Sequence, residues 1–277
     1  MKKRNNRIAN QRGTSFLEVM VALAIMGVIT AAIFKLYITS HKNYMAQNEV
    51  INVQQSARAS IDVLTRQIRM AGYGLPLGVP AITSSNTNPD TIAICYRNND
   101  CDTYLAAAMP QPSAELKCAT DVSCFSDGQW VYIFEPDSGG GEWFEITHVQ
   151  AAAKHLQHNT MSLSKKYGKD AILMSMVSIK FYVDNTTDPD HPYLMIELPG
   201  QGPQIFADNI IDLQFQYRMK NGVVMDSIIV PDDVREVQLS LTGRSMYEDT
   251  DVADLGEGDG FRRRTFSTSV FLRNVGI

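Results

Sequence analysis

The chain of 277 residues has room for a long helix and one large or two small domains, and its 44% hydrophobic and 20% charged residues are an ordinary globular composition. The formal net charge is −5, but the first thirteen residues contribute five basic residues and no acid, so the rest of the chain carries −10. An acidic body of this kind excludes nucleic-acid binding driven by bulk electrostatics.

The N-terminus joins a basic leader, MKKRNNRIANQRG, to a long apolar segment. Residues 16–34 contain one charged residue, Glu18, and the apolar pattern continues to Ile38 without the small-residue cleavage site of a secretory signal. About 20 helical residues cross the hydrocarbon core of a bilayer, so we expect a membrane-spanning segment at about 16–38. The positive-inside rule then predicts a cytoplasmic N-terminus and an exported body.

Glu18 is an unusual residue for the start of such a segment. A charged side chain at the centre of a bilayer helix costs about 2.5–3.5 kcal/mol on insertion scales. An acid in this place is therefore a candidate functional residue that needs a partner. The alternative is a simple anchor in which the Glu18 carboxylate lies at the interface and reaches the head groups.

The helical pattern continues beyond the apolar segment. The segment AGYGLP supplies glycine and proline residues that end a helix. We therefore predict a helix over residues 14–72, with a membrane-spanning first half and an amphipathic second half. Small and apolar residues recur at steps of three and four, the period of an amphipathic helix, at Ala46, Val50, Val53, Ala57, Ile61, Leu64 and Ile68.

Beyond residue 73 the apolar period changes to two, which is typical of strands. It is clearest in DLQFQYR, REVQLSLTG and RRTFSTSVFLR. Further strands are expected in DTIAICYR, QWVYIFEP, EWFEITHV, VSIKFYVD and YLMIELP, with hairpin turns at DSGGGE and NGVV. Because no repeated βα unit separates these segments, we predict an α+β fold: the long N-terminal helix packs on an antiparallel β-sheet globular domain at 73–277.

Four cysteines, Cys95, Cys101, Cys118 and Cys124, form two C-x5-C pairs. An even number of cysteines in an exported body favours disulfides over free thiols, and zinc sites have a closer C-x2-C spacing. Three connectivities are possible. We favour Cys95–Cys101 with Cys118–Cys124, because each short loop contains polar or turn-forming residues. The nested arrangement, Cys95–Cys124 with Cys101–Cys118, remains an alternative.

The sequence lacks the GxSxG, HExxH and P-loop motifs, so we expect no enzyme activity. His155 and His158 lie close together, but their surroundings are more typical of a solvated surface than of a metal site. The acidic loop at 248–259 could attract calcium, yet Ala253 occupies the fifth position of the calcium-loop motif, and we expect no cofactor. We expect the three arginines at 262–264 to contact an acidic protein partner and not DNA.

The junction RGTSFLEV resembles the processing site of type IV prepilins and of type II secretion pseudopilins, a class III signal peptide. The resemblance implies that a prepilin peptidase removes the leader, residues 1–13, by cutting between Gly13 and Thr14, and that Thr14 is then N-methylated. It also implies a partner for Glu18, namely the Thr14 amine of a neighbouring subunit in a bundle of apolar helices. Such a pair offsets much of the cost of burying each charge and sets the register between subunits.

Three further segments, ARASIDVLTRQIRMAGYG, FADNIIDLQFQYRM and RRRTFSTSVFLRN, resemble the PilW-like minor pilins and the related J-type minor pseudopilins. The resemblance implies a minor pilin that helps to initiate assembly at or near the tip of a type IV pilus. Its partners would be other minor pilins, the major pilin and the inner-membrane assembly platform.

Before incorporation, the protein would be a single-pass inner-membrane protein with a periplasmic body. A minor pseudopilin of type II secretion is the alternative, and a membrane-anchored periplasmic enzyme is a more distant one. The chain departs from the commonest family pattern at Thr14 and at Lys35, where many major pilins have a proline.

Overall fold

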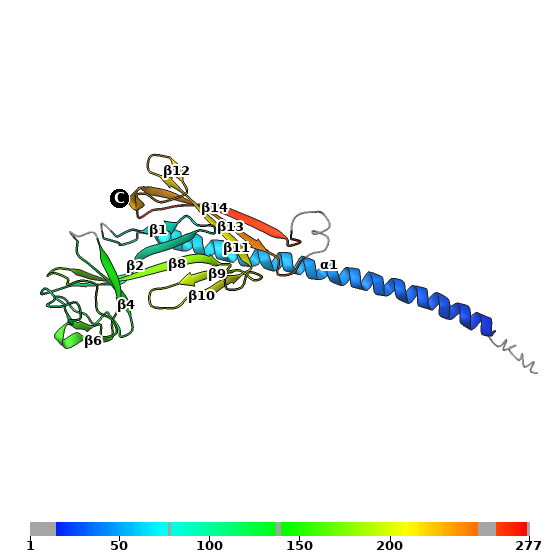
Figure 1. Ribbon diagram of the computed structural model, residues 1–277, viewed down its shortest axis with the longest axis horizontal. Coiled ribbons are helices and arrows are strands. Elements are labelled where there is room, and N and C mark those ends of the chain that lie inside the picture. Colours follow the sequence, from blue (N-terminus) through cyan, green and yellow to red (C-terminus); the bar gives the residue numbers. More distant parts are fainter. Residues whose placement is uncertain (1–14, 77–78, 137–139, 249–258, 276–277) are drawn as a thin grey trace, which may run out of the picture. The chain divides into compact units, whose positions relative to one another are not determined.

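The computed structural model describes residues 15–76, 79–136, 140–248 and 259–275 (Figure 1). The chain divides into two compact units, Met1–Glu49 and Val50–Ile277, which are described separately. Gly13, Thr14 and residues 249–258 of the acidic loop lie outside the described residues. Leader cleavage, Thr14 methylation and the interpretation of that loop therefore stay predictions.

Helix α1, Phe16–Met70, runs through both units. In the first unit its side chains are exposed as far as residue 45. In the second unit it buries five residues at steps of four, three, four and four, which is the spacing of one helix face. The amphipathic second half predicted from the sequence is thus confirmed. The five residues are Val53, Ala57, Ser60, Leu64 and Ile68.

Gly72 follows the end of α1 and fixes the path of the chain there. Its φ is +79°, a left-handed conformation that residues with a side chain disfavour. Its N–H donates a hydrogen bond to the carbonyl oxygen of Cys95 at 3.0 Å. A Cβ at this position would lie 2.6 Å from the carbonyl oxygen of Asn274. Glycine is therefore needed both for the turn and for the close approach of the C-terminal segment.

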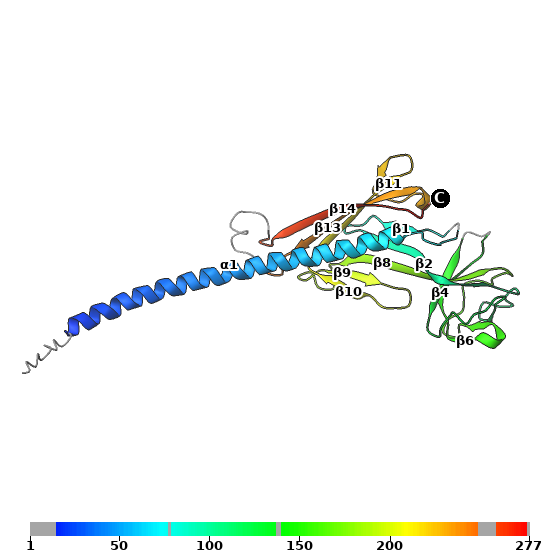
Figure 2. The same cartoon turned by 180° about the vertical axis from the view of Figure 1, so that it is seen from behind.

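Three antiparallel sheets follow α1 (Figures 1 and 2). The largest contains, in order, β1 (Ile82–Ser85), β2 (Thr91–Tyr104), β8 (Ile172–Asp184), β4 (Trp130–Phe134) and β5 (Gly141–Glu145), with β9 (Tyr193–Glu197) beside β8 and β10 (Gln204–Asp208) beside β9. The C-terminal sheet contains β12 (Val224–Met225), β11 (Ile210–Met219), β13 (Val234–Arg244) and β14 (Arg263–Phe271). The small sheet contains β3 (Leu116–Lys117), β7 (His155–Gln157) and β6 (His148–Gln150), and the short 3-10 helices are η1 (Ala151–Ala153) and η2 (Pro231–Asp233).

One hydrophobic core joins the second half of α1 to the two larger sheets. Leu64 and Ile68 of α1 are fully buried in it, together with Ile94 of β2, Phe181 of β8 and Leu241 of β13. Both sheets therefore use the same helix face as a common support. The fold is α+β, with a long N-terminal apolar helix packed on antiparallel sheets, as the sequence predicts.

The strands β2 and β8 continue beyond this core into a second one. Their pairing runs regularly from Ile92 to Arg97, shifts its register, and resumes at Asp102. The chain between the far ends of the two strands forms β3 to β7 and its own apolar cluster. We call residues 101–171 the insert lobe. Its buried residues include Leu116, Phe144 and Leu156.

The predicted turns lie between paired strands. NGVV joins β11 to β12, and Gly222 there has a φ of +83°. DSGGGE lies between β4 and β5, which pair with each other, although residues 137–139 are outside the described residues. The segment EWFEITHV was expected to be one strand, and this is wrong. It divides into β5, which pairs with β4, and β6, which pairs with β7, because the chain leaves one sheet for the other.

The structure contradicts both disulfide arrangements considered above. Cys101 is joined to Cys124 with their Cα atoms 5.8 Å apart, whereas Cys95 and Cys118 are free thiols. Cys95 pairs with Ser178 of β8, and Asp102, the residue after Cys101, pairs with Met174. These two partners are four positions apart on β8. Four residues of strand span about 13 Å. A disulfide bridges Cα atoms no more than about 7 Å apart, so Cys95 cannot reach Cys101.

Candidate functional site

The first unit presents one acid near the start of an apolar helix. Glu18 lies in the first turn of α1, and its Oε2 accepts a hydrogen bond of 3.4 Å from the main-chain N–H of Ser15. A carboxylate in the first turn also interacts favourably with the helix dipole. The Glu18 side chain is exposed, so its carboxylate is open to a further partner.

Apolar side chains follow Glu18 on every side of the helix. By length and composition α1 can cross a membrane, and none of its most apolar window is buried in the protein. A helix that is apolar all round needs an apolar environment, which a bilayer or a bundle of similar helices supplies. The largest exposed residues include Phe16, Leu17, Met20, Leu23, Met26, Ile29, Phe34 and Leu36.

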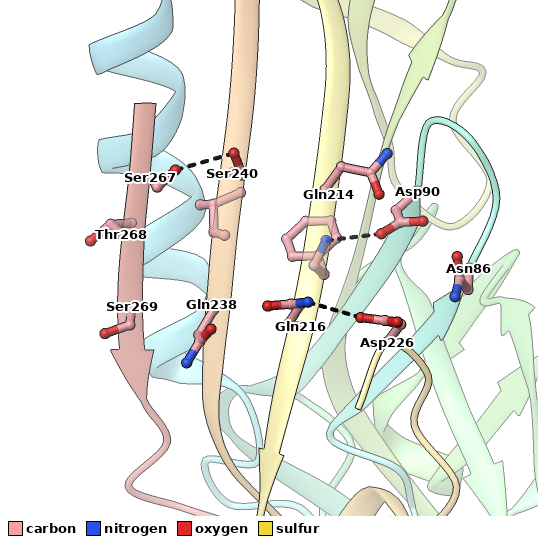
Figure 3. Close-up of a pocket in the computed structure, with 12 residues that line it drawn as sticks. Asn86, Asp90, Gln214, Gln216, Asp226, Gln238, Ser240, Ser267, Thr268 and Ser269 are labelled. Carbon is pink, nitrogen blue, oxygen red and sulfur yellow. Dashed lines mark hydrogen bonds between the residues drawn. The ribbon is translucent and has the colours of Figure 1, made fainter. Parts of the chain in front are cut away.

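A groove of about 710 Å³ lies on the outer face of the C-terminal sheet (Figure 3). Strand register arranges polar side chains in two rows across β11, β13 and β14. The intervening residues, such as Leu213 and Val237, point to the core on the other face. The rows are Gln214, Ser240 and Ser267, and Gln216, Gln238 and Ser269.

Asp90 forms part of one wall of this groove (Figure 3). The carboxylate is buried, and its Oδ2 accepts a hydrogen bond of 2.8 Å from the N–H of Phe215 while its Oδ1 accepts one of 3.1 Å from the N–H of Thr87. The Asp90 N–H donates to the carbonyl oxygen of Leu213 at 2.8 Å. Asp90 thus closes the edge of β11 just beyond the short strand β12.

Burial raises the pKa of Asp90 above its ordinary value. The hydrogen bonds from Phe215 and Thr87 lower that pKa, and the nearby carboxylates of Asp212 and Asp226 raise it. Asp226 is itself engaged, because its Oδ1 accepts a hydrogen bond of 3.0 Å from Gln216. Both acids of the groove wall therefore hold the strands in place.

The groove is suited to neutral hydrogen-bonding groups. Apart from Phe215 and Leu239, its described lining consists of amides, hydroxyls and two carboxylates, with no lysine, arginine or histidine among these residues. Within the part of the chain that the structure describes, no group of three or more histidines, cysteines or acids could hold a metal ion. This arrangement offers binding chemistry and no nucleophile–base pair.

One expectation about a histidine is wrong. His158 was expected at a solvated surface, but it is buried, and its ring nitrogens lie 2.9 Å and 2.8 Å from the carbonyl oxygens of Met161 and Ala114. Arg263 pairs with Asp259 of the same chain, and the expected contact of the three arginines with an acidic partner stays a prediction. The burial of His158 was not identifiable from sequence, because it depends on a contact with Ala114, which is distant along the chain.

Comparison with known protein families bears on the N-terminal segment. Residues 8–34 match the family described as the prokaryotic N-terminal methylation motif. The chain carries a prepilin signal. Type IV pilins carry a signal of this kind, and the matched range includes Gly13, Thr14 and Glu18.

Other comparisons add little to the prepilin signal. No curated protein matches the chain. A type IV-like pilin from Thermus thermophilus has a similar structure over 80% of this chain and 97% of that chain, at 11% sequence identity and a TM-score of 0.39. A likeness this distant carries no argument about function. The groove and the role of Asp90 were not predicted, because the only local signal is the turn sequence NTNPD.

Proposed function

We propose that this protein is a minor pilin of a type IV pilus, with a structural role and no catalysis of its own. One combination of features carries the proposal. The methylation motif at residues 8–34 coincides with the start of an exposed apolar helix that holds a single acid, Glu18, in its first turn. A simple membrane anchor has no need of that acid, which opposes insertion.

A bundle of apolar helices would provide a partner for the Glu18 carboxylate. After removal of residues 1–13 by a prepilin peptidase, Thr14 would bear a new, methylated amine four residues before Glu18. Each charge alone in an apolar bundle costs several kcal/mol, and the pair with a neighbouring subunit offsets much of that cost. The pair would fix one subunit relative to the next.

The minor role rests on the later part of the chain. Its body, residues 50–277, contains the insert lobe and is larger than that of most major pilins. The PilW-like segments favour a place with other minor pilins in the initiation of assembly, at or near the tip and in contact with the major pilin. The inner-membrane assembly platform would extract the subunit from the bilayer.

A minor pseudopilin of type II secretion is the second candidate, because its processing signal has the same form. The two roles separate in the cell. Loss of a minor pilin reduces piliation and leaves secretion intact, whereas loss of a pseudopilin has the reverse effect.

Glu18 variants test the proposal in a strain that lacks the native gene. We expect Glu18→Leu protein to insert in the membrane and to be cleaved, since a costly charge has been removed. It should be missing from sheared pili, because breaking one side of a buried pair costs about 3–5 kcal/mol. Glu18→Gln should be intermediate. Normal piliation with Glu18→Leu protein in the pili would refute the register role.

A further inference from the structure

The strand β14 leaves one long edge of the C-terminal sheet open. It pairs with β13 along all nine of its residues, and the sheet order ends with it. Figures 1 and 2 show β13 on one side of β14 and no strand on the other. Among the described residues, every other strand at a sheet edge is shorter than β14.

The hydrogen bonds at the two ends of the strand show which main-chain groups face outward. The N–H of Leu272 donates to the carbonyl oxygen of Arg235, and the N–H of Ser245 donates to that of Arg262. Bonded and non-bonded pairs alternate in an antiparallel ladder, so the even-numbered residues of β14 bond to β13. The odd-numbered residues present their N–H and C=O groups at the open edge. They are Arg263, Thr265, Ser267, Ser269 and Phe271.

Between Thr265 and Phe271, and among the residues that the structure describes, this edge shows none of the devices that protect exposed strands. Natural edges are blocked by charges, prolines, bulges or covering segments. The ladder between β13 and β14 has no register shift, and the stretch from Thr265 to Phe271 has no charge and no proline. The opposite edge of the same sheet is closed by β12 and by the bonds of Asp90 to Leu213 and Phe215. The contrast indicates that β14 is left open for pairing.

Charge indicates what kind of strand would pair there. Phe266 is half-buried, and the Arg58 guanidinium of α1 lies 5.8 Å from the centre of its ring. Arg264 precedes Phe266 by two residues and so lies on the same face of the strand. Both arginines are exposed. A carboxylate on an added strand near Phe266 would meet two positive charges, whereas a lysine there would be repelled.

We propose that the open edge of β14 binds an extended segment of a partner protein as an added antiparallel strand. The segment carries β-branched or small residues along Thr265–Ser269 and one or two acids near its C-terminal end, opposite Arg264. Main-chain bonds supply the affinity, and the acids supply orientation and selectivity. The proposal goes beyond the pilus role and does not depend on it.

A synthetic peptide tests this on the full-length chain in detergent. The probe is a capped nonapeptide of alternating threonine and valine that ends in two glutamates, and its control ends in two lysines. We expect the glutamate peptide to bind at least about tenfold more tightly in fluorescence anisotropy. Equal binding of the two peptides, or no binding of the glutamate peptide, would overturn the proposal.

Ser267→Pro is the matched edge variant, and Ser267→Ala is its control. The Ser267 N–H faces outward, so proline removes a donor to the added strand and no bond to β13. We expect Ser267→Pro to weaken peptide binding by about tenfold and Ser267→Ala to leave it within about twofold. Binding that survives in a folded Ser267→Pro protein would place the peptide elsewhere.

Hydrogen exchange gives a further test, which begins with the unmodified chain. Without peptide, the amides of Thr265, Ser267 and Ser269 should exchange rapidly, while those of Phe266 and Thr268 are protected. The glutamate peptide should slow the exchange of the amides of Thr265, Ser267 and Ser269. If these three amides are protected before peptide is added, the edge is already covered. If the protection at Thr265 and Ser269 is then lost in Ser267→Pro, a variant that would also block pairing between two copies of the chain, the occupant is a second copy. Either result overturns the proposal.

Discussion

The N–H of Phe215 donates a hydrogen bond of 2.8 Å to the Oδ2 of Asp90. Through this bond, the turn between β1 and β2 in the largest sheet holds the edge of β11 in the C-terminal sheet. The adjoining bond from the Asp90 N–H to Leu213 gives the same link in the other direction. A single residue, through its side chain and its main-chain N–H, therefore links the two sheets as a further pair of strand residues would.

Asp90→Ala should lower the free energy of unfolding by about 1–3 kcal/mol, because the buried main-chain N–H of Phe215 loses its acceptor, whereas the exposed Thr87 N–H keeps a second bond to the carbonyl oxygen of Ser85. The control is Asp226→Ala, whose partner Gln216 is exposed and can bond to water, so its effect should stay below about 1 kcal/mol. Denaturant titration of the full-length chain in detergent, followed by tryptophan fluorescence, measures both. Equal effects would contradict the role of Asp90 as the link.

The raised pKa of Asp90 predicts a pH dependence with a definite sign. The folded state holds this proton more tightly than the unfolded state, so the contribution of Asp90 to stability falls as pH rises above the ordinary value of 3.8. Asp90→Asn, which stays neutral, removes that dependence. The stability deficit of Asp90→Asn relative to the wild type should therefore be largest near pH 4 and shrink toward pH 7. A deficit that grows with pH would show that the pKa is lowered.

The local patterns of the sequence predict the main elements. The three- and four-residue steps of α1 and the alternation in β11, β13 and β14 come from neighbours along the chain, and a one-dimensional pattern records them. The insert lobe is different, because β2 and β8 pair across about seventy intervening residues. The pairing of Cys101 with Cys124 depends on that long-range closure, which loop length and composition do not specify.

The candidate sites divide in the same way. Gly13, Thr14 and Glu18 stand in one contiguous motif, so the sequence alone is enough to propose them as candidates. The groove is formed by rows of polar side chains from three strands. Part of its wall is Asp90, which lies in a turn that is distant from those strands along the chain. The burial of His158 likewise requires Ala114, over forty positions earlier in the chain, to lie beside it. Contacts between distant segments leave no periodic signal.

Gly200→Ala should destabilise the protein by about 2–4 kcal/mol. Gly200 has a φ of +71°, and a Cβ there would lie 1.9 Å from the ring of Trp130. The matched control is Gly202→Ala, two residues later, where a Cβ would meet nothing within 4 Å. Its effect should stay within about 0.5 kcal/mol. Thermal or denaturant unfolding measures the stability of both variants. Equal stability of the two would refute the packing of this turn on Trp130.

The free thiols should be detectable by alkylation under non-reducing conditions. Burial raises the pKa of Cys118 to about 11 and also raises that of Cys95, so neither should react in the folded chain near pH 8. In denaturant without reductant, mass spectrometry should find label on these two residues only, and reduction should add Cys101 and Cys124. Replacement of Cys101 by serine should cost about 2–4 kcal/mol of stability. Four blocked cysteines would contradict the pairing.

Processing at Gly13 can be tested independently of assembly. A prepilin peptidase that accepts only a small residue before the cut should fail on Gly13→Val, which would stay in the membrane as a full-length precursor beginning at Met1. Gly27→Val is the matched control, because Gly27 lies on the exposed apolar helix with nothing within 4 Å of a Cβ, and valine suits a bilayer environment. It should be cleaved like the wild type, whose mature chain should begin with a methylated Thr14. N-terminal mass spectrometry of membrane fractions distinguishes these species. A wild-type N-terminus at Ser15, or at any residue beyond Ala32, would show that another peptidase processes the chain, and the pairing of Glu18 with a Thr14 amine would then lose its chemical basis.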